Sequence, residues 1–169
     1  MKKLLPKMYK ENIYKINYNY LKEYGIRCLF FDMDNTLIDN KTKTPTQEVI
    51  DLMKKLKKEH FKIIIISNAL PNRLNKFVKQ LEIDDSISLA CKPLKRSYLK
   101  LMKKYKLNNH EIACIGDQIY TDIKGANNLN IFSILVDPIA KHEHIITKIN
   151  RIKERKIFRK YIRRGEYYG

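Results

Sequence analysis

The sequence predicts an α/β fold with a mainly parallel central sheet. From residue 26 to residue 137, short apolar runs alternate with segments whose apolar residues recur at helical spacing, which is the pattern of βα units. Acidic residues follow two of these runs, at the edge where open α/β sheets bind their ligands. The chain of 169 residues, 44% of them hydrophobic, is long enough for one core. We therefore expect a single domain with an N-terminal arm (1–25), a core (26–140) and a basic C-terminal tail (141–169).

Short apolar runs bounded by polar residues are expected to form the strands of the core. These runs cover residues 27–31, 62–67, 87–89, 111–115 and 132–136. After the first run, Thr44 is expected to cap a helix, with Pro45 at its first position and Gln47 completing a capping box. Three more helices are expected, starting near Pro71 and Leu94 and spanning roughly residues 120–128.

Apolar residues three and four positions apart define the inner faces of the expected helices. They are Val49, Ile50, Met53 and Leu56 in the first helix, Leu74, Phe77, Val78 and Leu81 in the second, and Tyr98, Leu101, Met102 and Tyr105 in the third. In the N-terminal arm, Ile13, Tyr20 and Tyr24 are expected to share one face of a helix that packs on the sheet. The tail interleaves Lys and Arg with Ile and Phe, which predicts a basic, partly amphipathic segment.

The charge is strongly positive, with 35 Lys and Arg against 18 Asp and Glu and a net charge of +17. Such an excess predicts attraction to nucleic acid, anionic lipid headgroups or phosphorylated ligands. The alternative is that the lysines only form solvated faces of a Lys-rich protein. Charge alone does not decide between these interpretations.

The cysteine pattern and the hydropathy pattern indicate a cytoplasmic protein. The three cysteines have no CxxC spacing, so neither a disulfide framework nor a zinc site is expected, and Cys28 and Cys114 are expected in the core. No apolar stretch approaches the roughly 20 residues that span a bilayer. Any membrane contact is therefore expected to be peripheral, at the inner face of the cytoplasmic membrane and through the basic tail.

Four short polar segments follow predicted strands and carry complementary chemistry. They are Asp32-Met33-Asp34-Asn35-Thr36, Ser67-Asn68, Lys92-Pro93 and the segment from Gly116 to Asp122. Alternate strand residues share a face, so Asp32 and Asp34 are expected to converge on one phosphate. Each segment alone is also typical of a turn or a helix cap, but the four together, in this order, indicate a catalytic site.

Hydrolysis of a phosphate monoester gives each of these groups a task. Asp32 is expected to be the nucleophile that forms an aspartyl-phosphate, and Asp34 the general acid and base. A divalent cation, Mg²⁺ by its preference for oxygen ligands, is expected between Asp32 and Asp117. Ser67 and Asn68 offer a hydroxyl and backbone N–H groups to the phosphoryl oxygens, and Lys92 adds positive charge. For Asp122 two roles stay open: completing the metal shell or fixing Lys92.

With these residues in place, the sequence resembles the haloacid dehalogenase-like (HAD) superfamily of phosphohydrolases over about residues 26–137. The DxDxT motif of that superfamily matches Asp32, Asp34 and Thr36, and its GDxxxxD motif matches Asp117 and Asp122. Ser67 falls on its second motif and Lys92 on its third. The resemblance implies a Rossmann-like three-layer α/β/α sandwich and adds the backbone carbonyl of Asp34 as a metal ligand. The spacing between motifs leaves no room for a folded cap domain.

More narrowly, the chain is similar to the YqeG-like branch, which is related to mitochondrial phosphatidylglycerophosphate phosphatases. The similarity rests on FFDMDNTL, ISNA, CKP, GDQIYTDI and an arm containing Leu5-Pro6. An open site suits a large substrate, such as a lipid headgroup, a phosphoprotein or a nucleic-acid end. Among these, the resemblance to this branch implies hydrolysis of phosphatidylglycerophosphate to phosphatidylglycerol. Two alternatives remain: a phosphatase of a nucleic-acid end or a nucleotide, and a non-enzymatic RNA- or ribosome-associated protein on the same scaffold. The role of Tyr120 and the oligomeric state stay open.

Overall fold

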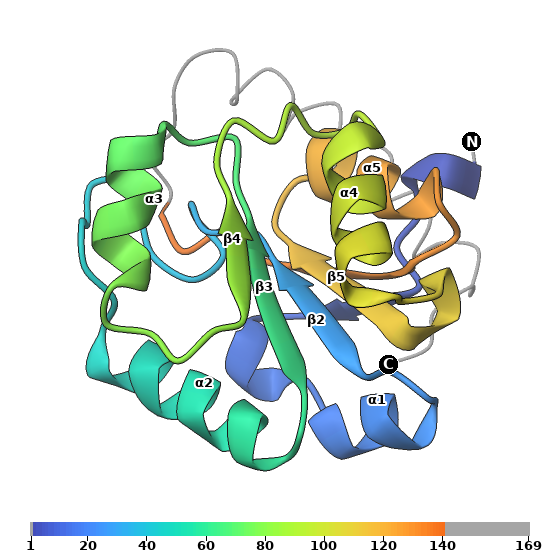
Figure 1. Ribbon diagram of the computed structural model, residues 1–169, viewed down its shortest axis with the longest axis horizontal. Coiled ribbons are helices and arrows are strands. Elements are labelled where there is room, and N and C mark those ends of the chain that lie inside the picture. Colours follow the sequence, from blue (N-terminus) through green and yellow to red (C-terminus); the bar gives the residue numbers. More distant parts are fainter. Residues whose placement is uncertain (1, 141–169) are drawn as a thin grey trace.

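The computed structural model describes residues 2–140; the expected amphipathic tail (141–169) lies outside the described residues. Six strands form one sheet in the order β1-β6-β5-β2-β3-β4, and all neighbouring strands run parallel (Figure 1). The strands are β1 (Met8–Lys10), β2 (Cys28–Phe31), β3 (Lys62–Ile66), β4 (Asp85–Ile87), β5 (Ile112–Gly116) and β6 (Phe132–Val136). The expected α/β class with a parallel sheet is confirmed.

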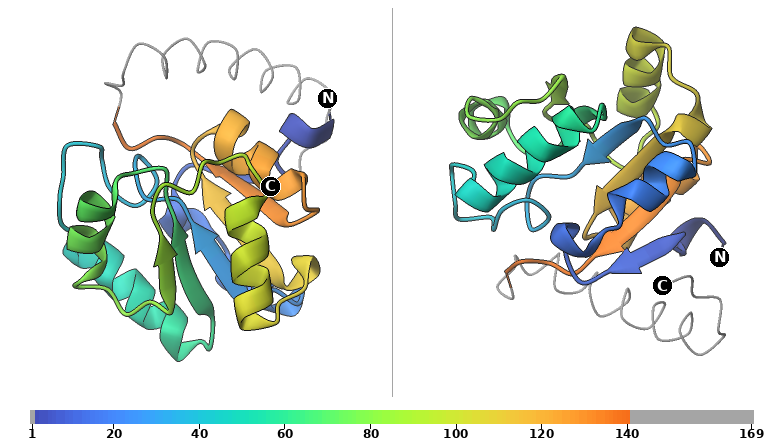
Figure 2. Two further views of the ribbon diagram at one scale, coloured as in Figure 1. Left: turned by 45° about the horizontal axis from the view of Figure 1, so that its top comes forward. Right: turned by 90° about the horizontal axis from the view of Figure 1, so that it is seen from below.

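Helices cover both faces of this sheet, as the two views in Figure 2 show. They are α1 (Tyr18–Glu23), α2 (Gln47–Lys58), α3 (Pro71–Val78), α4 (Arg96–Tyr105) and α5 (Lys124–Asn127), with a π-helical turn at Ile119–Ile123 and 3₁₀ turns at Lys2–Leu4, Ile13–Lys15 and Asn109–Glu111. Leu29 and Phe31 of β2 pack with buried residues of α2 and α3, whereas Cys28 and Phe30 pack with those of α4. Alternate strand residues therefore bury two separate apolar layers, and the three-layer sandwich is confirmed.

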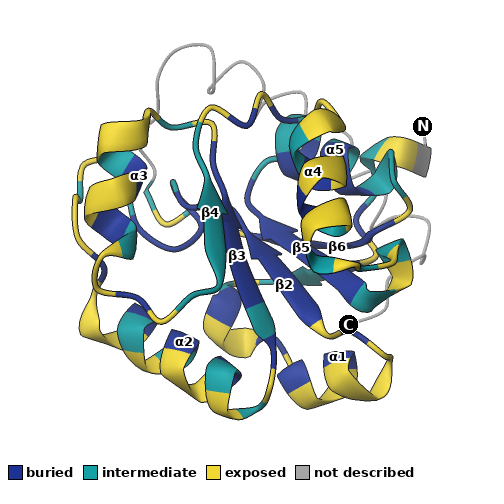
Figure 3. Ribbon diagram, in the orientation of Figure 1, coloured by how far each residue is buried: buried dark blue, intermediate teal, exposed yellow. Residues whose placement is uncertain are grey.

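The burial pattern follows this layering. In Figure 3 the central strands are dark blue and the outer faces of the helices are yellow. Cys28 and Cys114 are buried, as expected, whereas Cys91 is exposed. Buried strands read as near-continuous apolar runs when both faces of a parallel sheet are covered, and Ile63–Ile66 is such a run.

Two expected element boundaries were wrong. Helix α2 begins at Gln47 and not at Pro45, because the hydroxyl of Thr46 accepts the N–H of Val49 and caps the helix there. Strand β4 covers Asp85–Ile87, where it pairs with Ile64–Ile66, and not residues 87–89. Leu89 has a φ of 47°, a left-handed conformation that cannot continue a strand.

The N-terminal arm also differs from the expectation. Ile13 lies in a 3₁₀ turn and is buried, whereas Tyr20 and Tyr24 of the α1 region are 43% and 53% exposed, so the three do not form one inner face. The arm instead contributes β1, which pairs with β6 along the edge of the sheet. A three-residue strand is too short for a periodicity argument to find.

The parallel arrangement places four strand ends at one edge. Asp32 follows β2, Ser67 follows β3 and Asp117 follows β5, while Lys92 lies in the connection after β4. The connection between β2 and β3 contains α2, and the connection between β3 and β4 contains α3. Neither holds a folded cap domain, as expected. No helix in the described part of the chain is both long and apolar enough to span a bilayer.

Candidate active site

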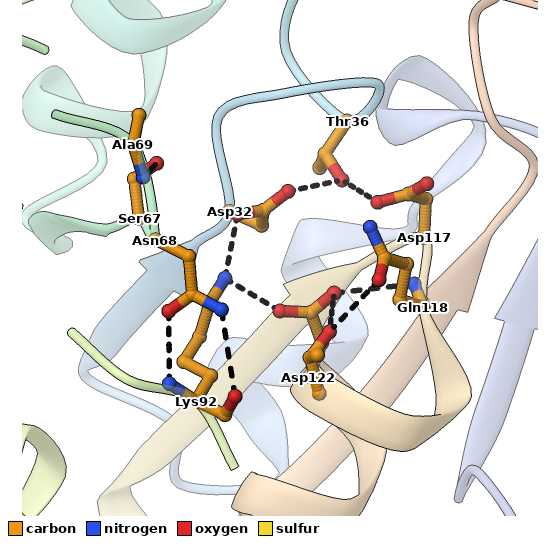
Figure 4. A network of polar contacts seen from close by, with 10 residues as sticks. Asp32, Thr36, Ser67, Asn68, Ala69, Lys92, Asp117, Gln118 and Asp122 are labelled. Carbon is orange, nitrogen blue, oxygen red and sulfur yellow. Dashed lines mark hydrogen bonds and ion pairs between the residues drawn. The ribbon is translucent and has the colours of Figure 1, made fainter. Parts of the chain in front are cut away.

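The centre of the site is a buried lysine held by two carboxylates. The Nζ atom of Lys92 lies 2.5 Å from Oδ1 of Asp32 and 2.6 Å from Oδ1 of Asp122 (Figure 4). All three residues are buried, and buried charges persist only when they are paired and hydrogen-bonded. The sequence left two roles open for Asp122: it contacts Lys92, and it is also one of three acids grouped closely enough to hold a metal ion.

Asp117 and Thr36 extend this network on the other side of Asp32. Oγ1 of Thr36 lies 3.4 Å from Oδ2 of Asp32 and 3.2 Å from Oδ1 of Asp117. A hydroxyl has one proton, so Thr36 donates to one of these two carboxylates at a time while its oxygen lies within hydrogen-bond distance of both. Thr36 therefore keeps the two acids side by side.

The acids of this network form a donor set suited to a hard cation. One carboxylate oxygen each from Asp32, Asp117 and Asp122 lies within 4.8 Å of the others, and oxygen ligands are those that Mg²⁺ prefers. Asp122 is already engaged, because its Oδ2 accepts the N–H of Gln118 at 3.1 Å and the hydroxyl of Thr121 at 3.4 Å. The three acids therefore form a donor set that fits a divalent cation.

Burial also sets the protonation of this cluster. It raises the pKa of Asp32 to about 7, against the opposing charge of Lys92. Burial acts against the charge of Lys92 as well, but the carboxylates of Asp122 and Asp32 outweigh it and raise the pKa of the ammonium group. Lys92 therefore stays charged. Because the cluster holds more carboxylates than lysines, Asp32 favours binding either a proton or a cation near neutral pH.

Asn68 contacts Lys92 and shapes its loop, and Ser67 precedes Asn68 at the end of β3. The amide of Asn68 brackets the Lys92 backbone: its Oδ1 accepts the Lys92 N–H at 2.8 Å and its Nδ2 donates to the Lys92 carbonyl at 3.4 Å. Oγ of Ser67 accepts the N–H of Ala69 at 3.0 Å. The side chain of Asn68 thus positions Lys92, which leaves its backbone N–H and the Ser67 hydroxyl as the predicted phosphate contacts.

The side chain of Asp34 contacts an arginine that the sequence did not single out. Nε and Nη2 of Arg73 lie 3.0 and 2.5 Å from Oδ1 of Asp34, and Arg73 also donates to the carbonyls of Thr42 and Asp39. Asp32 and Asp34 were expected to share one face of a strand. Because β2 ends at Phe31, both lie beyond the strand, and strand alternation does not determine where the Asp34 side chain points. Its Oδ2 accepts no hydrogen bond from the described residues. The signal that could have found Arg73 is its place in the first turn of the helix after Ser67-Asn68.

Two backbone positions make the site possible. A Cβ atom on Gly116 would lie 2.3 Å from Cγ of Asp122, so only glycine lets the two segments approach this closely. Asn35 has a φ of 64°, a left-handed conformation that asparagine tolerates better than most residues, and its N–H donates to the Ile38 carbonyl. Tyr120, whose role the sequence left open, is half-buried in the π-helical turn.

Comparison with known proteins identifies the family. The family model for the haloacid dehalogenase-like hydrolases matches residues 40–130, more than half of the chain. The chain is 32% identical over 161 residues to a protein of Bacillus subtilis (strain 168) named "Probable phosphatase YqeG", with 95% of this chain and 93% of that protein covered.

Solved structures share the fold at low identity. The D,D-heptose 1.7-bisphosphate phosphatase from B. bronchiseptica, complexed with magnesium and phosphate, matches with a TM-score of 0.55 at 12% identity, covering 65% of this chain and 80% of that chain. The 3-deoxy-D-manno-octulosonate 8-phosphate phosphatase from Moraxella catarrhalis matches with a TM-score of 0.51 at 15% identity, covering 70% and 82%. The family match and the likeness to the Bacillus protein together show that this chain belongs to the haloacid dehalogenase-like hydrolases, as a phosphatase of the YqeG type.

Proposed function

We propose that this phosphatase hydrolyses a phosphate monoester through an aspartyl-phosphate on Asp32, with Mg²⁺ as its cofactor. The observation that supports this most directly is the buried network in which Lys92 joins Asp32 to Asp122 while Asp117 lies beside it. This network combines a nucleophile, a fixed positive charge and a cation-binding pair at the ends of parallel strands. A bound Mg²⁺, held by Asp32, Asp117 and the Asp34 carbonyl, would neutralise negative charge on the phosphoryl group.

In the first step, a carboxylate oxygen of Asp32 attacks the phosphorus atom. A bond forms between Asp32 and phosphorus, and the bond from phosphorus to the leaving oxygen breaks. Asp34 gives its proton to the leaving alkoxide, work that contributes roughly 100- to 10,000-fold when the acid is well placed. Lys92 and the Ser67 hydroxyl hold the transferring group in line with the leaving oxygen.

In the second step, water attacks the aspartyl-phosphate. Asp34, now ionised, takes a proton from the water as the new oxygen–phosphorus bond forms and the bond to Asp32 breaks. Inorganic phosphate leaves, and Asp32 and Asp34 return to their starting protonation states. Splitting one hard displacement into two easier steps is the benefit of the covalent intermediate.

We infer that the physiological substrate is phosphatidylglycerophosphate, which the reaction converts to phosphatidylglycerol. Three observations support this substrate: the resemblance to the branch related to phosphatidylglycerophosphate phosphatases, the connections without a cap domain, and the net charge of +17. A large headgroup can reach an uncapped site without a domain movement. On this proposal the protein works at the inner face of the cytoplasmic membrane, with the basic tail (141–169) as a peripheral contact.

Phosphate release from this lipid in mixed micelles tests the proposal, with wild type and Asp32→Asn compared in the presence of Mg²⁺ and of a chelator. Release by the wild type alone, and only with Mg²⁺, is the expected result. Equal inactivity of the two proteins on the lipid and on a generic aryl phosphate would refute phosphatase chemistry at Asp32. Faster release from a 5′- or 3′-phosphorylated oligonucleotide or a nucleotide would assign the substrate to nucleic acid instead.

A further inference from the structure

Four of the five large aliphatic residues that are exposed in the described part of the chain lie on segments at the catalytic edge of the sheet, and the fifth, Leu99, lies within α4. Those most exposed are Leu70 (66%), Leu94 (62%), Leu89 (54%) and Ile139 (52%), and we call these four the apolar rim. Each lies on a segment that follows a strand: β3 for Leu70, β4 for Leu89 and Leu94, and β6 for Ile139. Single exposed leucines are common. Four exposed aliphatic residues beside one site instead indicate an apolar surface that binds a partner or a membrane.

Backbone hydrogen bonds tie the apolar rim to the catalytic segments. The N–H of Leu89 donates to the carbonyl of Ala69 at 3.0 Å, so Leu89 lies against the Ser67–Ala69 segment. The N–H of Ile139 donates to the carbonyl of Asn35 at 3.0 Å, next to Asp34. Leu70 directly follows Ala69, and Leu94 is two residues from Lys92. The rim therefore lies beside the catalytic segments, at the same edge of the sheet, and does not belong to a remote surface.

Basic residues accompany the apolar rim. Lys41 and Lys43, in the connection after β2, and Lys95 and Arg96, at the start of α4, are exposed. Aliphatic side chains flanked by Lys and Arg suit the boundary between headgroups and acyl chains of an anionic bilayer. A surface for single-stranded RNA would offer aromatic platforms, but the exposed aromatic residues of the described chain, Tyr14, Tyr20 and Tyr24, lie in the N-terminal arm.

We propose that the apolar rim docks onto an anionic phospholipid bilayer, so that the bilayer itself covers the catalytic site. This inference rests on the proposed function, since it gives a phosphatase without a cap domain its access to a lipid phosphate. The aliphatic side chains enter the membrane interface, and the basic residues contact lipid phosphates. The substrate headgroup then reaches Asp32 from the membrane side. Covering the site in this way excludes the water that a cap domain would exclude.

The chain has no tryptophan, so a single introduced tryptophan reports on each position. We would compare Leu70→Trp and Leu94→Trp with a matched control, Tyr20→Trp, which changes an exposed residue of α1. On vesicles of phosphatidylcholine mixed with phosphatidylglycerol, the two rim tryptophans should shift to shorter emission wavelength and be quenched by brominated acyl chains. The control tryptophan should change little, and vesicles of phosphatidylcholine alone should give a weaker response at the rim.

A second set of variants separates docking from catalysis. Replacing Leu70, Leu94 and Ile139 together by Ser should weaken vesicle binding by about tenfold or more and lower hydrolysis of vesicle-borne lipid, while hydrolysis of a soluble aryl phosphate is unchanged. The docking proposal is overturned if neither rim tryptophan responds to anionic vesicles, if Tyr20→Trp responds equally, or if only RNA produces the response. Rim insertion by a protein inactive on every phosphate ester would instead overturn the proposed function and leave the docking surface standing.

Discussion

Lys92 is the single residue that best shows how buried opposite charges in the site neutralise each other. Its ammonium group is buried and lies within 2.6 Å of two carboxylates. Burying any one of these three charges without its partners would destabilise the folded state. The sequence identified Lys92 and both acids from their places after strands. It could not decide whether Asp122 contacts the lysine, because that contact depends on the close approach of Gly116 to Asp122 across a turn.

Lys92→Met is expected to damage both stability and activity. Removing one partner of a buried ion pair leaves uncompensated charge, which costs about 3–5 kcal/mol of unfolding free energy. Loss of the positive charge at the phosphoryl group should lower activity at least about 100-fold. Urea unfolding and aryl phosphate hydrolysis measure the two effects. Lys104→Met is the matched control, because the Lys104–Asp85 pair is at the surface; an equal loss of stability in both variants would contradict the assigned role of burial.

Arg73 is expected to orient Asp34 through its planar group. Arg73→Lys keeps the charge but loses the fork that holds Asp34, Thr42 and Asp39 together. A poorly placed acid matters most when the leaving group is a poor one, so kcat should fall about tenfold or more for an alkyl phosphate and less for an aryl phosphate. Lys76→Gln, on the same helix and exposed, should change neither. An equal fall for both substrates would exclude a positioning role for Arg73.

At the scale of elements, the apolar periodicity predicted the central strands β2, β3, β5 and β6 and the main helices. It missed β1 and misplaced β4, and both are three-residue strands at the sheet edges that mix apolar with polar residues, such as Asp85 and Ser86 in β4. Edge strands pair with a neighbour on one side only, so their sequences carry a weaker apolar pattern. The arm was misassigned because its buried residues come from a strand, a 3₁₀ turn and a short helix in succession, and no single periodicity describes all three.

The arm is expected to be part of the hydrophobic core. Ile13 is 2% exposed and belongs to the same apolar cluster as Phe31 and Ile65 of the sheet, while its neighbour Tyr14 is 46% exposed. Ile13→Ala should therefore lower the free energy of unfolding by about 2–4 kcal/mol, measured by urea denaturation. Tyr14→Ala is the control and should have a much smaller effect. Similar values for the two variants would show that the arm packs only loosely.

At the scale of the whole molecule, a sheet that is parallel throughout gathers its chemistry at one edge. Acidic residues from β2 and β5 meet there beside Lys92 from the connection after β4, although the chain as a whole carries a net charge of +17. The sequence predicted this gathering because each of the four polar segments follows a predicted strand. On the function and the docking proposed above, the local negative cluster would hold the cation while the positive charge of the rest of the chain would face an anionic surface.

Mg²⁺ is expected to stabilise the folded protein, to an extent that depends on pH. A ligand that binds only the folded state adds about 2.7 kcal/mol at 100 times its dissociation constant. Asp32 must be ionised to bind the cation, and its pKa in the metal-free protein is raised to about 7, so Mg²⁺ competes with a proton. The affinity for Mg²⁺ should thus be full above pH 7 and fall about tenfold per pH unit below it.

Without Mg²⁺ the dependence on pH has the opposite sign. The pKa of Asp32 in the folded protein lies above its ordinary value of 3.8, so the folded state holds more protons between these values. The contribution of Asp32 to stability is therefore present at low pH and lost as the pH rises toward 7. Thermal unfolding with and without Mg²⁺, across this range, measures both effects. Asp117→Asn should abolish the gain from Mg²⁺ while Asp85→Asn, which changes a surface acid, keeps it; a gain that grows as the pH falls would show that the cation binds elsewhere.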